Sequence, residues 1–518
     1  MRTQYDVLVI GGGINGAGIA RELSGRGLAV MLCEKDDLAS HTSSASTKLI
    51  HGGLRYLEYR EFGLVRKALQ EREVLLRSAP HIMWPLRFVM PHDAGMRPAW
   101  MIRLGLFLYD HLAQREVLPG SSSIDLSEHL AGDALRPGFK RGYVYSDGWV
   151  DDARLVVLNA MDAHERGAVI LTRTECVNVE RAPAGWTATL QPRGARGSER
   201  AFAQPLRIQA RALVNAAGPW AAQFLQEYAQ LQDTRSLRLV KGSHIVVKQL
   251  YSHPMAYIFQ NTDRRITFAI PYEEHFTLIG TTDVEHKGAI GEAKMTAEEC
   301  DYMCEQVGRY FRRAIIPEDV VWSYSGVRPL LDDASGSPAA VTRDYRLDLD
   351  TSQAPLLSVW GGKITTYRKL AEQAADQLCP VLGSRARGWT AQVPLPGGDM
   401  GDGGTVSSDP VADFAQFLQD ALLRYPWLPE GICRRYARAY GTRMDSLLAG
   451  ARGIHDLGHE IAPGLYHTEL QYLLEREWAL DATDVLWRRS KLGLHLSAPE
   501  RQAVADWYMT KGGRELCA

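Results

Sequence analysis

The 518-residue sequence predicts a fold that is part α/β and part α+β and that ends in an all-helical region. Residues 5–34 carry the pattern of strand, glycine turn, helix and strand with which a parallel sheet begins. Residues 240–283 contain strand patterns in close succession, which favours an antiparallel sheet in a second domain. Beyond about residue 410 the apolar residues recur at helical spacing.

The N-terminal element opens with Tyr5–Ile10, and a second strand is expected at Leu28–Glu34. Both are mostly apolar runs, which suits strands that a parallel sheet buries on both faces. Ala17–Arg26 between them has helical spacing. The pattern therefore predicts the first strand-helix-strand unit of a nucleotide-binding sheet.

The glycine turn after the first strand reads G-x-G-x-x-G. Gly11 permits a tight turn, Gly13 lets the backbone approach a pyrophosphate, and Gly16 allows the helix to pack closely. The helix N-terminus, with Ile14 and Asn15, then offers N–H groups and a positive dipole end to phosphates.

Glu34 ends the second strand, where a carboxylate can bind ribose hydroxyls. With strand, turn, helix and acidic residue in place, the sequence predicts a dinucleotide site rather than a merely structural turn. This unit does not distinguish FAD from NAD, because both cofactors use the same cradle.

The remaining elements follow in order. Residues 39–47 are rich in Ser, Thr and Ala and indicate a loop, and a charged amphipathic helix is expected over Glu61–Ser78. More strands of the nucleotide domain are expected at Ala168–Leu171, Ala212–Ala216 and Leu356–Trp360, the last followed by Gly361-Gly362 and a helix from about Thr366. The antiparallel strands are expected at Ser243–Lys248, Arg265–Pro271 and Phe276–Thr281.

Glycine and proline gather between Pro394 and Gly404, which predicts a linker. The expected helices beyond it are Asp413–Leu423, Cys433–Leu448 and Glu469–Lys491.

Composition excludes several classes of protein. The formal net charge of −2 gives no reason to expect nucleic acid as a partner. The seven cysteines are scattered and form no CxxC pair, so we expect reduced thiols in a cytoplasmic protein and no metal site. The N-terminus lacks a signal pattern, and no apolar run is long enough for a spanning helix.

Six stretches resemble, in this order, the aerobic FAD-dependent glycerol-3-phosphate dehydrogenase family, and the similarity covers nearly the whole chain. They are Ser46–Leu57 (STKLIHGGLRYL), Asn215–Trp220 (NAAGPW), Lys241–His244 (KGSH), Ile270–Tyr272 (IPY) leading to Gly280–Asp283 (GTTD), Gly326–Leu330 (GVRPL) with Thr342–Tyr345 (TRDY), and Gly361–Arg368 (GGKITTYR).

The resemblance implies a glutathione-reductase-like nucleotide fold, an antiparallel-sheet substrate cap domain and a helical C-terminal domain. The boundaries expected for the FAD-binding domain are 1–80, 145–235 and 340–390. Those for the cap are 81–144 and 236–339, followed by a linker at 391–410 and the C-terminal domain at 411–518.

The resemblance also implies an activity. FAD, held without a covalent bond, takes a hydride from sn-glycerol 3-phosphate, and dihydroxyacetone phosphate is formed. The electrons pass to a membrane quinone, so the protein is expected at the cytoplasmic face of the inner membrane as a peripheral protein, often a homodimer.

Residue roles follow from the same resemblance. The residues expected to bind FAD are Gly11, Gly13, Ile14, Asn15, Gly16, Glu34, Lys35, Ser46, Lys48, His51, Gly53, Val177, Ala216, Gly218, Gly362, Lys363 and Thr365. Those expected to bind substrate are Arg55, Tyr56, Arg343 and Lys363, and those expected to act in catalysis are His244, Arg328 and His51.

The chemistry of the substrate agrees with these residue types. A phosphate dianion needs fixed cations, and arginine and lysine supply a planar fork and a point charge. The hydroxyl proton needs a base, for which histidine is suited near neutral pH. We favour His244 as the base and His51 as a neighbour of the flavin, while Arg328 is an alternative stabiliser of the developing alkoxide.

Three other functions remain open at this stage. An oxidase of the same substrate would pass electrons to oxygen, although the surface insertion of such oxidases is not obvious here. An FAD-binding sensor would have lost the cationic residues, which are present. An amino-acid oxidase would need fewer phosphate-binding cations.

The apolar stretch Ala99–Tyr109 (AWMIRLGLFLY) is too short to cross a bilayer. It suits a buried core helix and an interfacial helix equally well. A quinone acceptor favours the interfacial interpretation, with Trp100 and Tyr109 at the headgroups and Arg97 and Arg103 near anionic lipid.

Overall fold

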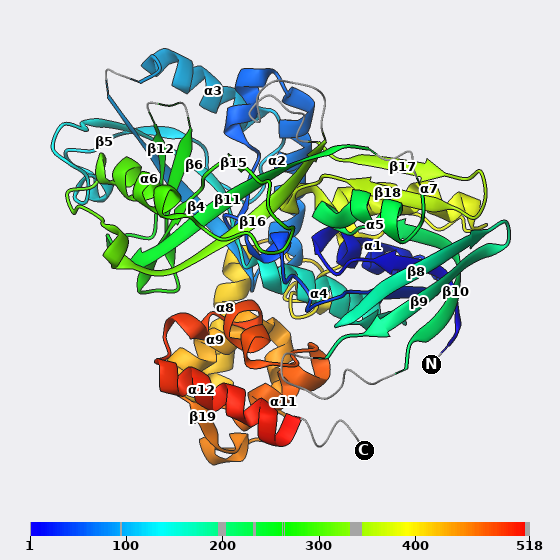
Figure 1. Ribbon diagram of the computed structural model, residues 1–518. Helices are drawn as coiled ribbons and strands as arrows, with labels where there is room; N and C mark the ends of the chain where they lie inside the picture. The colour runs from blue at the N-terminus through cyan, green and yellow to red at the C-terminus, as the bar shows by residue number, and fades with distance from the viewer. Residues whose placement is uncertain are drawn as a thin grey trace.

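The computed structural model describes residues 2–93, 96–194, 204–231, 235–261, 263, 265–331 and 344–512. Two large sheets lie side by side in Figure 1, and a helical region built from the C-terminal part of the chain lies below them.

The first sheet is mainly parallel and has the strand order β17-β18-β10-β1-β2-β7. Its strands are β1 (Gln4–Ile10), β2 (Val30–Cys33), β7 (Val169–Leu171), β10 (Leu206–Asn215), β17 (Arg346–Asp350) and β18 (Leu356–Trp360), with the antiparallel pair β8 (Thr174–Ala182) and β9 (Gly185–Pro192) attached through β10. The predicted strands of the nucleotide sheet are therefore confirmed.

Four helices contribute to one apolar core with this sheet. They are α1 (Ile14–Gly25), α4 (Asp152–Glu165), α7 (Tyr367–Val381) and the C-terminal end of α2 (Phe62–Ser78). The first helix begins at Ile14, three residues earlier than predicted. The glycine at position 16 interrupts the apolar periodicity, so the first turn of the helix could not be recognised from the sequence pattern. On the other face, α5 (Ala221–Glu227) covers the sheet with apolar residues of β8–β10.

The second sheet has the order β15-β11-β14-β13-β12-β4-β6-β3, with β16 beside β11 and β5 beside β6. Its strands are β3 (Leu49–Ile50), β4 (Met83–His92), β5 (Ser122–Asp125), β6 (Arg141–Val150), β11 (Leu237–Lys248), β12 (Ala256–Gln260), β13 (Ile266–Tyr272), β14 (Phe276–Gly280), β15 (Val284–Glu285) and β16 (Val320–Leu331). The strands predicted between residues 243 and 281 pair antiparallel, as expected.

Helices cover both faces of the second sheet. On one face lie α2 (Phe62–Ser78) and α3 (Ala99–His111), and on the other lies α6 (Ala297–Gly308). The predicted helix over residues 61–78 is confirmed.

The C-terminal region has its own apolar core. Its α-helices are α8 (Pro410–Arg424), α9 (Glu430–Tyr440), α10 (Met444–Leu447), α11 (His467–Arg476) and α12 (Ala498–Trp507). The prediction that this region is all helical is wrong, because the strands β19 (Glu460–Ala462) and β20 (Leu465–Tyr466) form a hairpin between α10 and α11.

Two predicted C-terminal helices are shorter in the structure. The one over 433–448 breaks at Gly441, where φ is 54°. The one over 469–491 breaks after Arg476, because Trp478 adopts a left-handed conformation with φ 54°. A separate turn at Asp484–Arg489 follows this break and reaches the nucleotide domain.

The glycine- and proline-rich segment around Pro394 packs against the body of the protein. Leu395 is buried in the core of the nucleotide domain and its N–H donates to the carbonyl of Ser78. Gly397 needs its positive φ of 85°, and a Cβ there would lie 2.2 Å from the carbonyl oxygen of Tyr440. This segment therefore holds the helical region in place.

Candidate cofactor and substrate site

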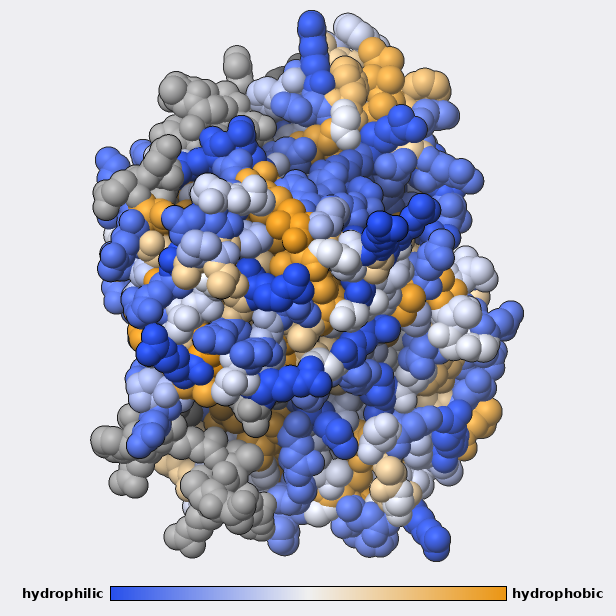
Figure 2. Space-filling model, turned by 90° about the vertical axis from the view of Figure 1, so that its right-hand side faces the viewer, coloured by the Kyte–Doolittle hydropathy of each residue, from blue (hydrophilic) through white to orange (hydrophobic). Residues whose placement is uncertain are grey.

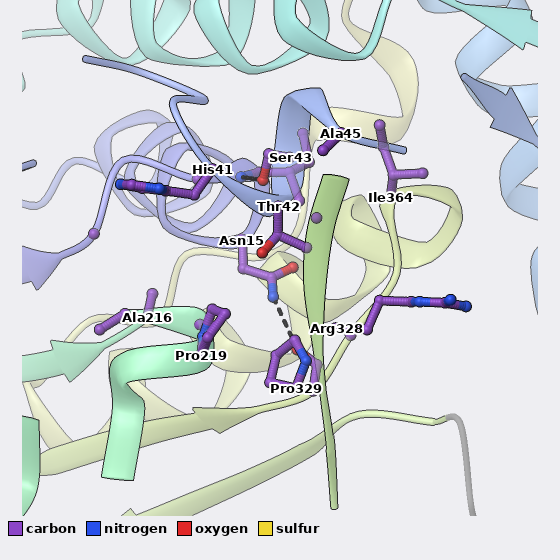
Figure 3. A pocket seen from close by; sticks show the side chains of 18 of the residues that line it. Asn15, His41, Thr42, Ser43, Ala45, Ala216, Pro219, Arg328, Pro329 and Ile364 are labelled. Carbon is purple, nitrogen blue, oxygen red and sulfur yellow. Dashed lines mark hydrogen bonds between the residues drawn. The ribbon is translucent and has the colours of Figure 1, made fainter. Parts of the chain in front are cut away.

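A cavity of about 440 Å³ lies where the carboxyl ends of the parallel strands meet the second sheet. Its walls come from the loops after β1, β10 and β18, from residues 39–51 and from β11 and β16. Figure 3 shows Asn15, Thr42, Ala216 and Arg328, which line the cavity from these separate parts of the chain.

The glycine turn forms one wall, and the backbone leaves no room for a Cβ at Gly11 or Gly16. Gly11 has φ 107°, and a Cβ there would lie 2.6 Å from the carbonyl oxygen of Ala216. A Cβ on Gly16 would lie 1.9 Å from the carbonyl oxygen of Gly11, so this glycine serves helix packing. A Cβ on Gly13 would meet only the Ser43 hydroxyl, at 3.1 Å, and would point toward the cavity.

Polar groups at the start of α1 are held by loops from elsewhere in the chain. The Ile14 N–H donates to Ser43 Oγ at 3.0 Å, and Asn15 Nδ2 donates to the Gly361 carbonyl at 3.2 Å (Figure 3). Within the described residues, the buried Oδ1 of Asn15 has no hydrogen-bond partner.

Glu34 lies at the far end of the same cavity. Its carboxylate accepts the Gly12 N–H at 2.6 Å and the Asp36 N–H at 2.9 Å, and burial raises its pKa. Beside it, Lys35 Nζ lies 3.7 Å from the centre of the Trp220 ring. These groups suit an adenosine, with the carboxylate at the ribose.

The cradle as a whole fits FAD. Gly11, Gly13 and the start of α1 would hold the pyrophosphate, and Glu34 the adenosine ribose. The flavin ring would lie toward His51, Gly362 and Thr365, which line the other end of the cavity.

His244 is the principal titratable group on the substrate side. It is buried, its Nε2 lies 2.9 Å from Thr47 Oγ1, and its ring stacks on Tyr324 with centroids 4.8 Å apart. Burial, followed by the charges of Lys48 and Arg328, lowers the pKa of His244 well below its usual value. The imidazole is therefore neutral at pH 7 and has a lone pair that can accept a proton.

Arg328 extends from β16 into the cavity (Figure 3). Its Nη2 donates to the Thr282 carbonyl at 3.0 Å and to Asp283 Oδ1 at 2.5 Å. The hydroxyl of Thr282 is fixed in turn by Glu299, at 2.8 Å. These contacts fix the orientation of the Arg328 guanidinium before any substrate binds.

Lys363 supplies a second cation. Its Nζ lies 3.9 Å from the centre of the Tyr56 ring. Tyr56 packs over Gly53, where a Cβ would lie 2.2 Å from the Tyr56 ring and where φ is 76°. Nearby, the His51 N–H donates to Thr365 Oγ1 at 3.3 Å.

The cavity brings together most of the residues that the sequence indicated. Those that line it are Gly11, Gly13, Ile14, Asn15, Glu34, Lys35, Ser46, His51, Tyr56, Ala216, Gly218, His244, Arg328, Gly362, Lys363 and Thr365. Those that do not are Gly16, Lys48, Gly53, Arg55 and Val177. Arg343 lies outside the described residues.

Lys48 is the clearest case of a residue behind the cavity wall. Its ammonium is buried, 2.7 Å from Asp152 Oδ1 and 3.1 Å from the carbonyl of Ser44. Sequence reasoning also missed Ser43, Thr47 and Asp283, all of which line the cavity. Thr47 belongs to the motif Ser46–Leu57 and Asp283 to the motif Gly280–Asp283. Membership of these motifs could have identified both as residues of the site.

Comparison with known proteins agrees with this geometry. Residues 6–368 match the model of the FAD dependent oxidoreductase family, and residues 389–507 match the C-terminal domain of alpha-glycerophosphate oxidase. A glycerol-3-phosphate dehydrogenase of Pseudomonas aeruginosa is 51% identical over 507 residues, covering 98% of this chain and 95% of the relative.

Two further relatives are informative. A D-erythritol 1-phosphate dehydrogenase of Brucella abortus is 48% identical over 504 residues, covering 97% of each chain. The structure of the glycerol-3-phosphate dehydrogenase from Bacillus halodurans complexed with FAD superposes with a TM-score of 0.78 at 29% identity, covering 99% of this chain and 92% of that one.

The family model spans more than half of the chain, and the relatives extend the match to nearly all of it. The resemblance noted in the sequence motifs is confirmed, and so is FAD as the cofactor. The chain belongs to the FAD-dependent glycerol-3-phosphate dehydrogenase family.

Proposed function

We propose that the chain oxidises sn-glycerol 3-phosphate to dihydroxyacetone phosphate and passes the electrons to a membrane quinone. The observation that carries this proposal is the single cavity that holds a dinucleotide cradle at one end and a neutral histidine with two cations at the other. We also propose that the mainly parallel sheet forms the FAD-binding domain, in the glutathione-reductase-like manner, and that the second sheet forms the substrate cap, with the boundaries given above.

We assign the phosphate contacts to Arg328 and Lys363 and the proton transfer to His244. Arg328 and Lys363 bind the phosphate dianion, or Arg328 instead stabilises the alkoxide as it forms. His244 accepts the hydroxyl proton at a ring nitrogen, because its imidazole is neutral. Bound FAD supplies the hydride acceptor, held without a covalent bond.

An assay with a dye acceptor tests the substrate. Glycerol 3-phosphate, D-erythritol 1-phosphate and an α-amino acid are compared, because a relative acts on the second compound and the wider fold includes enzymes for the third. We expect the highest kcat/KM with glycerol 3-phosphate. A higher value with either other substrate would contradict the proposal, and peroxide formed in stoichiometric amounts in air would make the protein an oxidase.

We predict that His244→Ala acts mainly on turnover. Because burial and nearby cations lower the pKa of His244, its imidazole stays in the basic form in mildly acidic buffer, so the kcat of the wild type, measured with saturating substrate, should fall only at more acidic pH. The variant should have a much lower kcat, by roughly 10²- to 10⁴-fold, and lack this acidic limb. A profile from pH 5 to pH 9 that keeps its shape in the variant would place the base elsewhere.

We also propose that α3 attaches the protein to a membrane surface. Among the described residues, no helix has the length and apolar character to cross a bilayer. One face of α3 packs Ile102, Leu106 and Tyr109 into the core, while the opposite face exposes apolar side chains. The exposed ones are Trp100, Met101, Leu104 and Phe107, each at 44–66% of its surface.

The surroundings of α3 support this proposal. Tyr59 adds exposed apolar surface in the turn Leu54–Tyr59, which contacts α3, and Arg103 is exposed on the helix itself. In Figure 1, α3 lies at the upper end of the molecule, and Figure 2 shows hydrophobic side chains at that same end. Tyr109, expected at the headgroups, is instead buried with its hydroxyl donating to Asp147.

Flotation with anionic liposomes tests the attachment. Burying three of these side chains in the interface contributes roughly 5 to 9 kcal/mol, at about 1.5–3 kcal/mol each. We therefore expect the wild type to float and the double variant Trp100→Glu/Phe107→Glu to stay at the bottom. Val411→Glu/Leu423→Glu, which places two acids on exposed positions of α8, is the matched control and should float. Equal flotation of all three would exclude α3 as the anchor.

A further inference from the structure

We propose that the C-terminal helical region retains the cofactor, because Arg488 and Arg489 hold Asp37 and thereby position the loop that lines the adenosine end of the cavity. The inference rests on FAD occupying the cradle described above, and it gives the C-terminal region a role in cofactor binding.

Asp37 is the point of contact. It follows Glu34 by three residues and is 1% exposed. Arg489 donates to both of its oxygens, from Nη1 at 2.6 Å and from Nη2 at 2.7 Å, and Arg488 Nε adds a third bond at 2.5 Å. Burial opposes its ionisation, but the two arginines outweigh it and lower the pKa of Asp37 to about 2. The carboxylate is therefore charged and fully paired.

A second connection runs through Arg173, in the turn between β7 and β8. Its Nη2 donates to Asp481 and to Asp484, both at 2.7 Å, so the C-terminal turn holds this side chain as well. Its backbone N–H donates to the carbonyl of Asp36 at 2.7 Å. Residues 36 and 37 are thus held from two sides by the same C-terminal turn, residues 481–489.

The held loop continues directly into the cavity wall. The carbonyl of Asp37 accepts the Ser40 hydroxyl at 2.6 Å, and the Ala39 N–H donates to the Gly12 carbonyl at 3.2 Å. Ala39, Ser40 and His41 line the cavity next to Glu34. A shift of Asp37 would therefore move groups that face the adenosine and loosen the glycine turn.

The network joins six buried or half-buried charges and continues from Arg489 through Glu477 to Arg154. Its members are Asp37, Arg173, Asp481, Asp484, Arg488 and Arg489. Three carboxylates balance three guanidinium groups, so removing one member leaves a buried charge without compensation. Arg154 and Glu477 form a further buried ion pair between the two regions, and Glu477 Oε2 lies 3.9 Å from Arg489 Nε.

The test compares Arg489→Met with Arg435→Met. Arg435 pairs with the buried carboxylate of Glu469 within the C-terminal region and contacts no cofactor loop, so its loss matches the cost of breaking a buried pair. The dissociation constant and dissociation rate of FAD are followed by flavin fluorescence, and the melting temperature of each FAD-free protein is recorded. Because the readout is FAD itself, a different substrate would leave the result unchanged.

We expect Arg489→Met to release FAD at least 10-fold faster than Arg435→Met, at similar melting temperatures of the FAD-free proteins. Asp37→Asn should weaken FAD binding as well, and its combination with Arg489→Met should add little, because both remove the same contact. If Arg489→Met does not fold, Arg488→Met and Asp37→Asn are compared with Arg435→Met instead, and FAD should leave both faster than it leaves Arg435→Met. The proposal would be overturned if Arg489→Met, Arg488→Met and Asp37→Asn retained FAD as well as Arg435→Met does.

Discussion

Replacing Gly13 with leucine is expected to give a folded protein that contains no FAD. The Cβ of the new side chain would meet only the Ser43 hydroxyl, at 3.1 Å, so the polypeptide can accommodate it. The rest of the leucine would extend into the cavity where the pyrophosphate must approach the backbone. The purified variant should be colourless, show no flavin absorption near 450 nm under conditions in which the wild type is yellow, and melt at the temperature of the FAD-free wild type.

Two further glycine variants sharpen this test. Gly16→Leu should fail to fold, because its Cβ would lie 1.9 Å from the carbonyl oxygen of Gly11. Gly63→Ala on α2 has no neighbouring atom within 4 Å and should retain FAD. A Gly13→Leu protein that copurifies with stoichiometric FAD would place the pyrophosphate away from this turn.

Weaker capture of the substrate is expected for Arg328→Met and Lys363→Met, each of which removes one cation from the substrate end of the cavity. Loss of one charge-assisted contact to a phosphate costs about 1.5–3 kcal/mol, which corresponds to roughly 10- to 100-fold in kcat/KM. FAD content should be unchanged by Arg328→Met. Steady-state kinetics with glycerol 3-phosphate, together with the flavin spectrum, provide the measurement.

The Arg328 variant also leaves the carboxylate of Asp283 without its partner, which would repel the phosphate further. The double variant Arg328→Met/Asp283→Asn should therefore recover part of the loss. Arg55→Gln is expected to have a smaller effect, since Arg55 does not line the cavity. Arg207→Met, at an exposed surface ion pair, is the neutral control. Unchanged kinetics in both cavity variants would remove these cations from the site.

The parts of the site that the sequence predicted are those in which local sequence dictates local geometry. The turn from Gly11 to Gly16 leaves the backbone few alternatives, and Glu34 ends the next strand at a fixed distance from it. The antiparallel strands between residues 243 and 281 followed from their length and composition. In each case one short segment contains all the information that the prediction needs.

Other features depend on partners far away in the sequence. Lys48 lies in a motif, but only the position of Asp152 determines that its ammonium points behind the cavity wall. The break at Trp478 interrupts a helical pattern so that Asp484–Arg489 can reach Asp37, and no local signal identifies such a contact. Similarly, α3 is apolar on both faces, and only the fold determines which face is buried.

The strand order of the parallel sheet has a consequence for the biosynthesis of the protein. β1 pairs with β10 and β10 with β18, so the cofactor cradle is assembled from Gly11, Gly218 and Gly362 at the ends of three strands distant in sequence. At about 5–20 residues per second, a ribosome takes roughly 20 to 70 seconds to pass from the first glycine turn to the last of these loops. β1 has an unpaired edge until β10 is made, β10 then has one until β18 is made, and the cradle is incomplete throughout. FAD therefore finds a complete cradle only after residue 362 of the 518 has been made, and translation pauses before β18 would extend the period in which chaperones must protect the unpaired strand edges.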